Sequence, residues 1–168
     1  ARLAESAGIQ ALAIHGRTRA CMFEGLAEYE TIAEVKSRLR IPVIANGDIA
    51  TPEDAKRARE LTGADGIMIG RGAQGRPGLF REIPHNLAGG ERLAPPPARE
   101  IGAVLAEHLE GLYSLYGGEH GARVARKHIG WTVRHLPGGE RFRGEVVRVP
   151  DAPAQHAAVN DYFARLAA

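Results

Sequence analysis

Short apolar runs alternate with amphipathic stretches over the first half of the sequence. The runs at residues 12–14, 41–45 and 66–69 are rich in Ile, Val and Leu, as strands buried on both faces are. Between them, residues 29–39 and 52–62 space apolar side chains three or four positions apart, which predicts one helix in each interval. This alternation predicts a parallel sheet with right-handed crossovers, an α/β fold.

The second of these helices has clear start and stop signals. Thr51 can accept a backbone N–H bond as a cap, Pro52 suits the first helical position, and the two acids that follow lie where the helix dipole favours negative charge. Gly63 predicts a left-handed end. The expected apolar stripe is Ala55, Ala58 and Leu61.

The pattern changes to helices only in the second half. Residues 98–116, 119–135 and 154–166 each keep one apolar face, whereas the stretch from Gly138 to Pro150 is expected to be irregular. Gly and Pro are frequent before residue 98, which predicts a linker over residues 85–97. The predicted domains are therefore an α/β part over residues 1–84 and an all-helical domain over residues 98–168.

Three strands cannot close a (β/α)₈ barrel, which needs eight strands and about 250 residues. The α/β part is therefore either a small open sheet or the last three strands of a truncated barrel. The sequence begins at Ala1, without methionine, inside a stretch with helical character. We therefore expect that an N-terminal part of the protein is missing.

Composition excludes some classes of function. The formal net charge of +2 permits a polyanionic partner without requiring one. We expect a cytoplasmic protein without a membrane partner, because there is no long apolar run and no signal-peptide pattern. The single cysteine, Cys21, excludes an internal disulfide and a Cys-rich zinc site, and no metal is expected.

Polar and glycine residues follow each predicted strand, at the edge where parallel sheets bind ligands. These residues are His15-Gly16-Arg17, Asn46-Gly47-Asp48 and Gly70-Arg71-Gly72. A glycine-rich loop with an arginine, followed by a short helix, is typical of a phosphate site.

Each of these segments also has a simpler interpretation. Residues 46–48 alone are more typical of a plain turn, and His15 is as typical of a structural histidine as of a ligand. Arg17 and Arg19 are expected to be exposed charges, and a loop containing Phe23 is expected over residues 22–28.

Several segments together resemble a known family, the bacterial tRNA-dihydrouridine synthases of the B type. The segments are HGRTRACMFEGLAEY, IPVIANGDI, TGADGIMIGRGAQGRPGLFREI and ARKHIGW. The resemblance implies an FMN-containing (β/α)₈ TIM barrel, here its last three strands, followed by a helical tRNA-binding domain. It also implies reduction of uridine to 5,6-dihydrouridine in tRNA with electrons from NADPH, by a protein expected to be monomeric.

The resemblance also implies roles for individual residues. The implied flavin-site residues are His15, beside the isoalloxazine and the target base, Asn46, Gly47 and Asp48, and the phosphate ligands Gly70 and Arg71. The residues implied to face tRNA phosphates are Arg123, Arg126 and Lys127. With Arg134 they also form an arc of the predicted helix that is separate from its apolar arc.

The resemblance places the catalytic cysteine upstream of this chain, so no catalytic residue is expected within it. Cys21 lies outside the family's cysteine motif. We therefore expect these residues alone to be inactive, which stoichiometric FMN and dihydrouridine formation by the isolated chain would refute.

Two other functions use the same features. One is a phosphate-binding barrel isomerase or lyase of a small metabolite, which would leave the basic helical region without a purpose. The other is a non-catalytic RNA- or nucleotide-binding module. Flavin absorbance of the protein would separate the flavin-dependent synthase from both of these alternatives.

Overall fold

The computed structural model describes residues 1–22 and 24–168, so Phe23 of the expected 22–28 loop lies outside the described residues. The chain forms two compact units. The α/β unit comprises residues 1–73 and 77–93, and the helical unit comprises residues 74–76 and 94–168.

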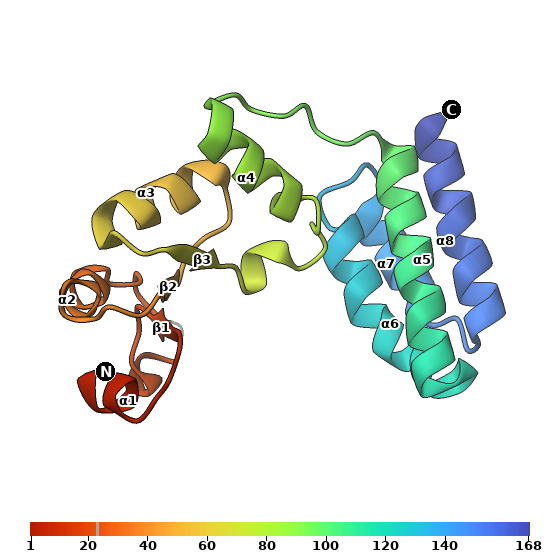
Figure 1. The fold of residues 1–168 in the computed structure, drawn as a ribbon. Coiled ribbons are helices and arrows are strands. Elements are labelled where there is room, and N and C mark those ends of the chain that lie inside the picture. The colour runs from red at the N-terminus through yellow and green to blue at the C-terminus, as the bar shows by residue number, and fades with distance from the viewer. Residues whose placement is uncertain (23) are drawn as a thin grey trace. The chain divides into compact units, whose positions relative to one another are not determined.

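The α/β unit is built on a parallel sheet of strands β1 (Leu12–His15), β2 (Val43–Asn46) and β3 (Gly66–Met68), in that order (Figure 1). Its helices are α1 (Arg2–Ser6), α2 (Glu30–Arg38), α3 (Pro52–Thr62) and α4 (Leu79–Gly89), with short 3₁₀ turns η1 (Arg19–Cys21) and η2 (Arg71–Ala73). Sequential parallel order is that of a barrel segment. The predicted α/β class is therefore confirmed.

Helix α3 follows the predicted signals with one exception. The Thr51 hydroxyl accepts the Asp54 N–H, the Asp54 carboxylate accepts the Thr51 N–H, and Gly63 ends the helix at φ 62°. Leu61, however, is 57% exposed, and Thr62 is buried in its place. Thr62 lies closer to the buried stripe because it follows Ala58 by four residues, and its hydroxyl donates to the Ala58 carbonyl.

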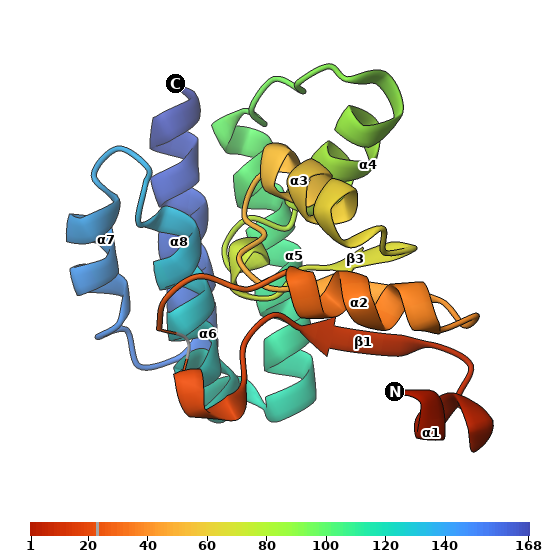
Figure 2. The same cartoon turned by 90° about the vertical axis from the view of Figure 1, so that its left-hand side faces the viewer.

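The helical unit contains α5 (Ala98–Tyr116), α6 (Gly118–Val133), α7 (Gly139–Val146) and α8 (Ala152–Ala167). Helices α5, α6 and α8 run side by side (Figure 2). Their core contains Gln155, a fully buried polar residue. Its Oε1 accepts the Tyr113 hydroxyl at 2.9 Å and its Nε2 donates to the Ala122 carbonyl at 3.2 Å, so both ends of the amide are used.

Two helices extend into segments expected to be irregular. Helix α7 forms because Phe142 and Val146, four residues apart, are both buried, and Phe142 stacks on Tyr162 at 4.3 Å. Helix α4 continues to Gly89, through the first five residues of the expected linker, because Leu87 adds to its apolar face. Within the described part of the chain, the helices are too short or too polar to cross a bilayer.

Candidate functional site at the carboxyl ends of the strands

The three strand ends lie at one edge of the sheet. His15 is in register with Asn46, and Asn46 with Met68. The Gly16 N–H donates to the Asn46 carbonyl at 2.9 Å, and Asn46 Nδ2 donates to the Met68 carbonyl at 2.7 Å. The loops that leave the strands therefore start beside one another, as the alternation of elements predicted.

The loop after β2 has an unusual backbone. Gly47 has φ 135° and Asp48, which is not a glycine, has φ 49°. A Cβ atom at Gly47 would lie 2.6 Å from the Ala27 Cβ, so only glycine fits there. The buried Tyr29 hydroxyl donates to the Gly47 carbonyl at 2.7 Å, which holds this turn against the start of α2.

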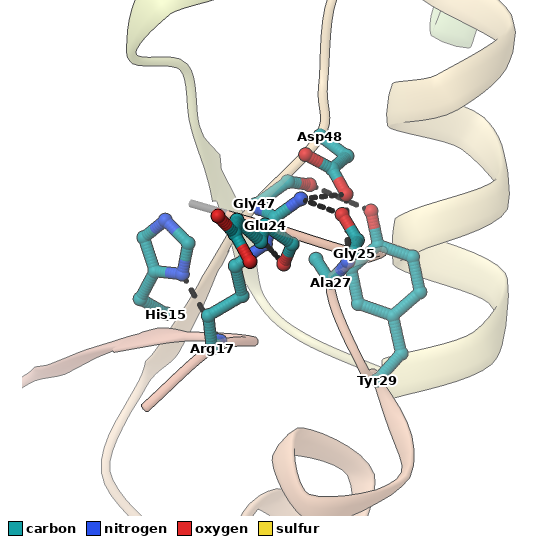
Figure 3. Close-up of polar contacts among 8 residues, drawn as sticks. All are labelled: His15, Arg17, Glu24, Gly25, Ala27, Tyr29, Gly47 and Asp48. Carbon is teal, nitrogen blue, oxygen red and sulfur yellow. Dashed lines mark hydrogen bonds and ion pairs between the residues drawn. The ribbon is translucent and has the colours of Figure 1, made fainter. Parts of the chain in front are cut away.

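Arg17 is not the exposed charge that the sequence suggested. Its side chain is 6% exposed, and its Nη2 lies 2.8 Å from Oδ2 of Asp48, whose side chain is 26% exposed. Arg17 also donates from Nε to the Glu24 carbonyl at 3.1 Å and from Nη2 to the Gly25 carbonyl at 2.6 Å (Figure 3). One guanidinium thus ties the loop after β1 to the loop after β2.

One oxygen of the Asp48 carboxylate accepts two hydrogen bonds from within the chain. Besides Arg17, its Oδ2 accepts the Ala27 N–H at 2.6 Å. Burial alone would raise the pKa of Asp48, but the Ala27 and Arg17 hydrogen bonds and the nearby charge of Arg71 bring that pKa below its ordinary value of 3.8. Asp48 is therefore charged near neutral pH.

His15 lies at the same edge with an exposed ring. Its Nδ1 accepts the backbone N–H of Arg17 at 3.1 Å. Its Cε1 lies 3.7 Å from where a Cβ of Gly47 would stand, so the ring packs beside the glycine turn.

The loop after β3 packs tightly against the loop after β2. A Cβ atom at Gly72 would lie 2.3 Å from the Ile49 carbonyl oxygen and 2.9 Å from the Ala50 Cα, so this position requires glycine. Arg71 is exposed, and its charge acts on the pKa of Asp48. The structure therefore brings together the six residues expected at the flavin site: His15, Asn46, Gly47, Asp48, Gly70 and Arg71.

The three basic residues expected to face RNA lie on α6 of the helical unit. Arg123 is exposed and pairs with Glu119 at 3.3 Å. Lys127 is exposed and lies over the Trp131 ring, 5.9 Å from its centroid. Arg126 is half-buried, and its Nε has no hydrogen-bond partner among residues 1–22 and 24–168.

Sequence reasoning missed a cluster of rings beside this basic face. The His128 ring packs edge-on against His108 of α5 at 4.7 Å and against Trp131 at 5.1 Å. Burial, followed by the charges of His108 and Lys127, lowers the pKa of His128. No spacing signal links His108 to α6, because their proximity arises only from helix packing.

Comparison with known proteins decides the family. The family model described as dihydrouridine synthase (Dus) matches residues 1–167. The chain belongs to the dihydrouridine synthase family. This confirms the resemblance seen in its motifs.

Among the relatives of this dihydrouridine synthase family member are proteins named tRNA-dihydrouridine synthase B. The Pseudomonas aeruginosa protein is 54% identical over 164 residues, which cover 98% of this chain and 49% of the relative. The Escherichia coli protein is 49% identical over 167 residues, which cover 99% of this chain and 52% of the relative. The chain thus spans about half the length of the curated relatives it matches.

Proposed function

We propose that this chain carries the FMN-phosphate end of the active site and the RNA-contacting helices of a tRNA-dihydrouridine synthase. The complete enzyme would reduce uridine in tRNA to 5,6-dihydrouridine with electrons from NADPH. The observation that carries the proposal is that the loops after the three strands lie beside one another, next to the exposed Arg71. The loops after β2 and β3 each contain a glycine, Gly47 and Gly72, where a side chain would collide with a neighbouring loop. Because the proposed substrate is tRNA, we propose that the protein acts in the cytoplasm.

The residues present fit a flavin mononucleotide. A phosphate dianion requires backbone N–H donors and a positive charge, and residues 70–72 offer both. A Cβ at Gly70 would meet no atom within 4 Å, so this backbone is open to a ligand, whereas Gly72 fixes the loop against Ile49. When bound, FMN supplies the hydride chemistry.

The chain's own residues would bind and orient rather than react. Gly70 and Arg71 would hold the phosphate, and residues 46–48 would shape the wall of the site. His15 has an exposed ring at the same edge, where it would meet a polar edge of the flavin or the target base.

The helical unit supports a polyanionic substrate. Arg123 and Lys127 are exposed on α6, one turn apart, so both can meet a phosphate backbone. Trp131 and His128 beside Lys127 add aromatic surface. In the proposed reaction the uridine would leave its stack before it meets the flavin.

The test uses the full-length protein and the Arg71→Gln substitution. We expect flavin absorbance in the wild type and an FMN dissociation constant at least about tenfold higher in the variant, because a charge-assisted phosphate contact is lost. Arg38→Gln is the matched control, since Arg38 lies on α2 and is 58% exposed. A protein that binds no flavin but binds a phosphorylated metabolite would favour the isomerase or lyase reading instead.

A further inference from the structure

The protonation of the His15 ring follows from one backbone contact. The Arg17 N–H donates to His15 Nδ1 at 3.1 Å. A backbone amide can only donate, so Nδ1 must carry a lone pair. The neutral imidazole then has its proton on Nε2, which makes Nε2 a hydrogen-bond donor.

The position of the Arg17 amide is itself held by the Arg17 side chain. The guanidinium contacts the Glu24 carbonyl, the Gly25 carbonyl and the Asp48 carboxylate, and 94% of the side chain is buried, since only 6% is exposed (Figure 3). Its Nη1 is also buried, without a hydrogen-bond partner in the described part of the chain. A residue with this many anchors cannot shift its backbone independently.

Asp48 completes the arrangement. Its Oδ2 accepts both Arg17 and the Ala27 N–H, and its own backbone is at φ 49°. Left-handed backbone at a non-glycine residue persists where surrounding contacts over-determine it. The contacts that do so here join the loop after β1 to the loop after β2.

We propose that the Arg17–Asp48 ion pair is a positioning device for His15. It holds the Arg17 amide on Nδ1, so that the ring presents Nε2–H to a carbonyl oxygen of a planar heterocycle. The ligand class rests on the proposed function, and the source of the oxygen is either the flavin ring or the uracil base. Arg17 and Asp48 act through His15 rather than by touching the ligand.

The geometry disfavours the opposite orientation. With Nδ1 occupied by a donor, the ring has no acceptor left for an N–H of the ligand. The ring lies beside the glycine turn, since its Cε1 would stand 3.7 Å from a Cβ placed at Gly47. His15 therefore selects for acceptor atoms.

The tautomer can be measured without any ligand. Long-range ¹H–¹⁵N spectra of the ¹⁵N-histidine-labelled chain at pH about 8 distinguish Nδ1–H from Nε2–H, and His15→Gln identifies the signal. We expect the pure Nε2–H form in the wild type. In Asp48→Asn and Arg17→Lys we expect a shift toward the mixture recorded for the same protein unfolded in urea. An Nδ1–H ring in the wild type, or an unshifted signal in both folded variants, would overturn the proposal.

The second test uses the full-length enzyme and separates the two oxygen sources. If His15 meets the flavin, Asp48→Asn raises the FMN dissociation constant about tenfold, as measured by flavin fluorescence. If it meets uracil, kcat/KM for tRNA falls about tenfold in Asp48→Asn, a larger change than the rise in the FMN dissociation constant. Arg17→Lys, which keeps the positive charge, should cause a smaller loss of the same kind than Asp48→Asn. If both variants leave both quantities unchanged, the positioning role is wrong.

These outcomes are distinct from failure of the proposed function. A full-length protein without flavin or tRNA activity would refute the proposed function, yet the tautomer measurement would still report on the Arg17–Asp48 pair. Conversely, an active flavoenzyme whose Asp48→Asn and Arg17→Lys variants both keep the wild-type tautomer and affinities would refute the positioning role alone.

Discussion

Replacing the three basic residues of α6, Arg123, Arg126 and Lys127, by glutamine should weaken tRNA binding and its dependence on salt. Arg123 forms an ion pair with Glu119, and the two side chains are 56% and 82% exposed. Because so exposed an ion pair contributes little stability, Arg123 can leave Glu119 and bind a phosphate at small cost. Lys127 keeps its ammonium group over Trp131 and is exposed. Arg126 is half-buried, so we expect it to contribute the least of the three.

The magnitude follows from the number of phosphates neutralised. Each contact contributes about 0.7 to 0.9 to the slope of log Kobs against log salt concentration. Two contacts, from Arg123 and Lys127, give a slope reduction of about 1.4 to 1.8. A third contact, from Arg126, raises the upper limit to about 2.7.

The assay is a binding titration of the chain with a tRNA transcript between about 50 and 200 mM salt, where such slopes are resolved. The matched control replaces Arg99, Arg141 and Arg165, which are exposed on α5, α7 and α8, and changes the net charge by the same amount. An unchanged slope in the α6 variant would refute the assignment of RNA contact to α6. An equal reduction in the control would show a general charge effect instead.

Three further predictions concern the glycine loop, pH and the buried amide. Gly72→Ala should raise the FMN dissociation constant of the full-length protein about tenfold or more by flavin fluorescence, because its Cβ would lie 2.3 Å from the Ile49 carbonyl oxygen. Burial alone would raise the pKa of Asp48, but its hydrogen bonds lower it, so its contribution to stability is complete above the ordinary value of 3.8 and is lost as pH falls through the lowered value. The Tm of the wild type minus that of Asp48→Asn should therefore be constant above pH about 5 and should shrink as the pH falls below that value. Gln155→Leu leaves the half-buried Tyr113 hydroxyl without its partner and removes one bond to the Ala122 carbonyl, so it should lower the free energy of unfolding in urea by about 1 to 3 kcal/mol, less in a Tyr113→Phe background.

The elements of the α/β unit could be predicted because their signals are local. The Thr51 cap and the Gly63 stop depend on side chains within a few residues of the helix ends, and both are present in the structure. Helix α7 could not be predicted in this way. Over its eight residues only Phe142 and Val146 are both apolar and fully enclosed, and a helix this short shows no measurable period. Its stability comes from packing on α6 and α8.

The location of the candidate site could also be predicted, because parallel strands end at one edge. The burial of Arg17 was missed, although a signal for it exists. His15 and Asn46 are in register, 31 positions apart, and Arg17 and Asp48 have the same separation. Once the register of two parallel strands is known, residues that follow both strands at the same offset are expected neighbours. An arginine and an aspartate at such positions predict an ion pair rather than two exposed charges.

The roles of Asn46 and Asp48 show why a list of polar residues at strand ends overstates the number of ligands. The Asn46 amide nitrogen bonds to the Met68 carbonyl, and the Asp48 carboxylate bonds to Arg17 and Ala27. Both polar side chains of this turn therefore join neighbouring loops to one another. Because those bonds fix the backbone of the turn, we propose that the turn would contribute the shape and the peptide groups of the loop to the binding of a nucleotide. Substitutions at Asn46 or Asp48 that keep these hydrogen bonds should then preserve FMN binding better than substitutions that keep only the charge of the side chain.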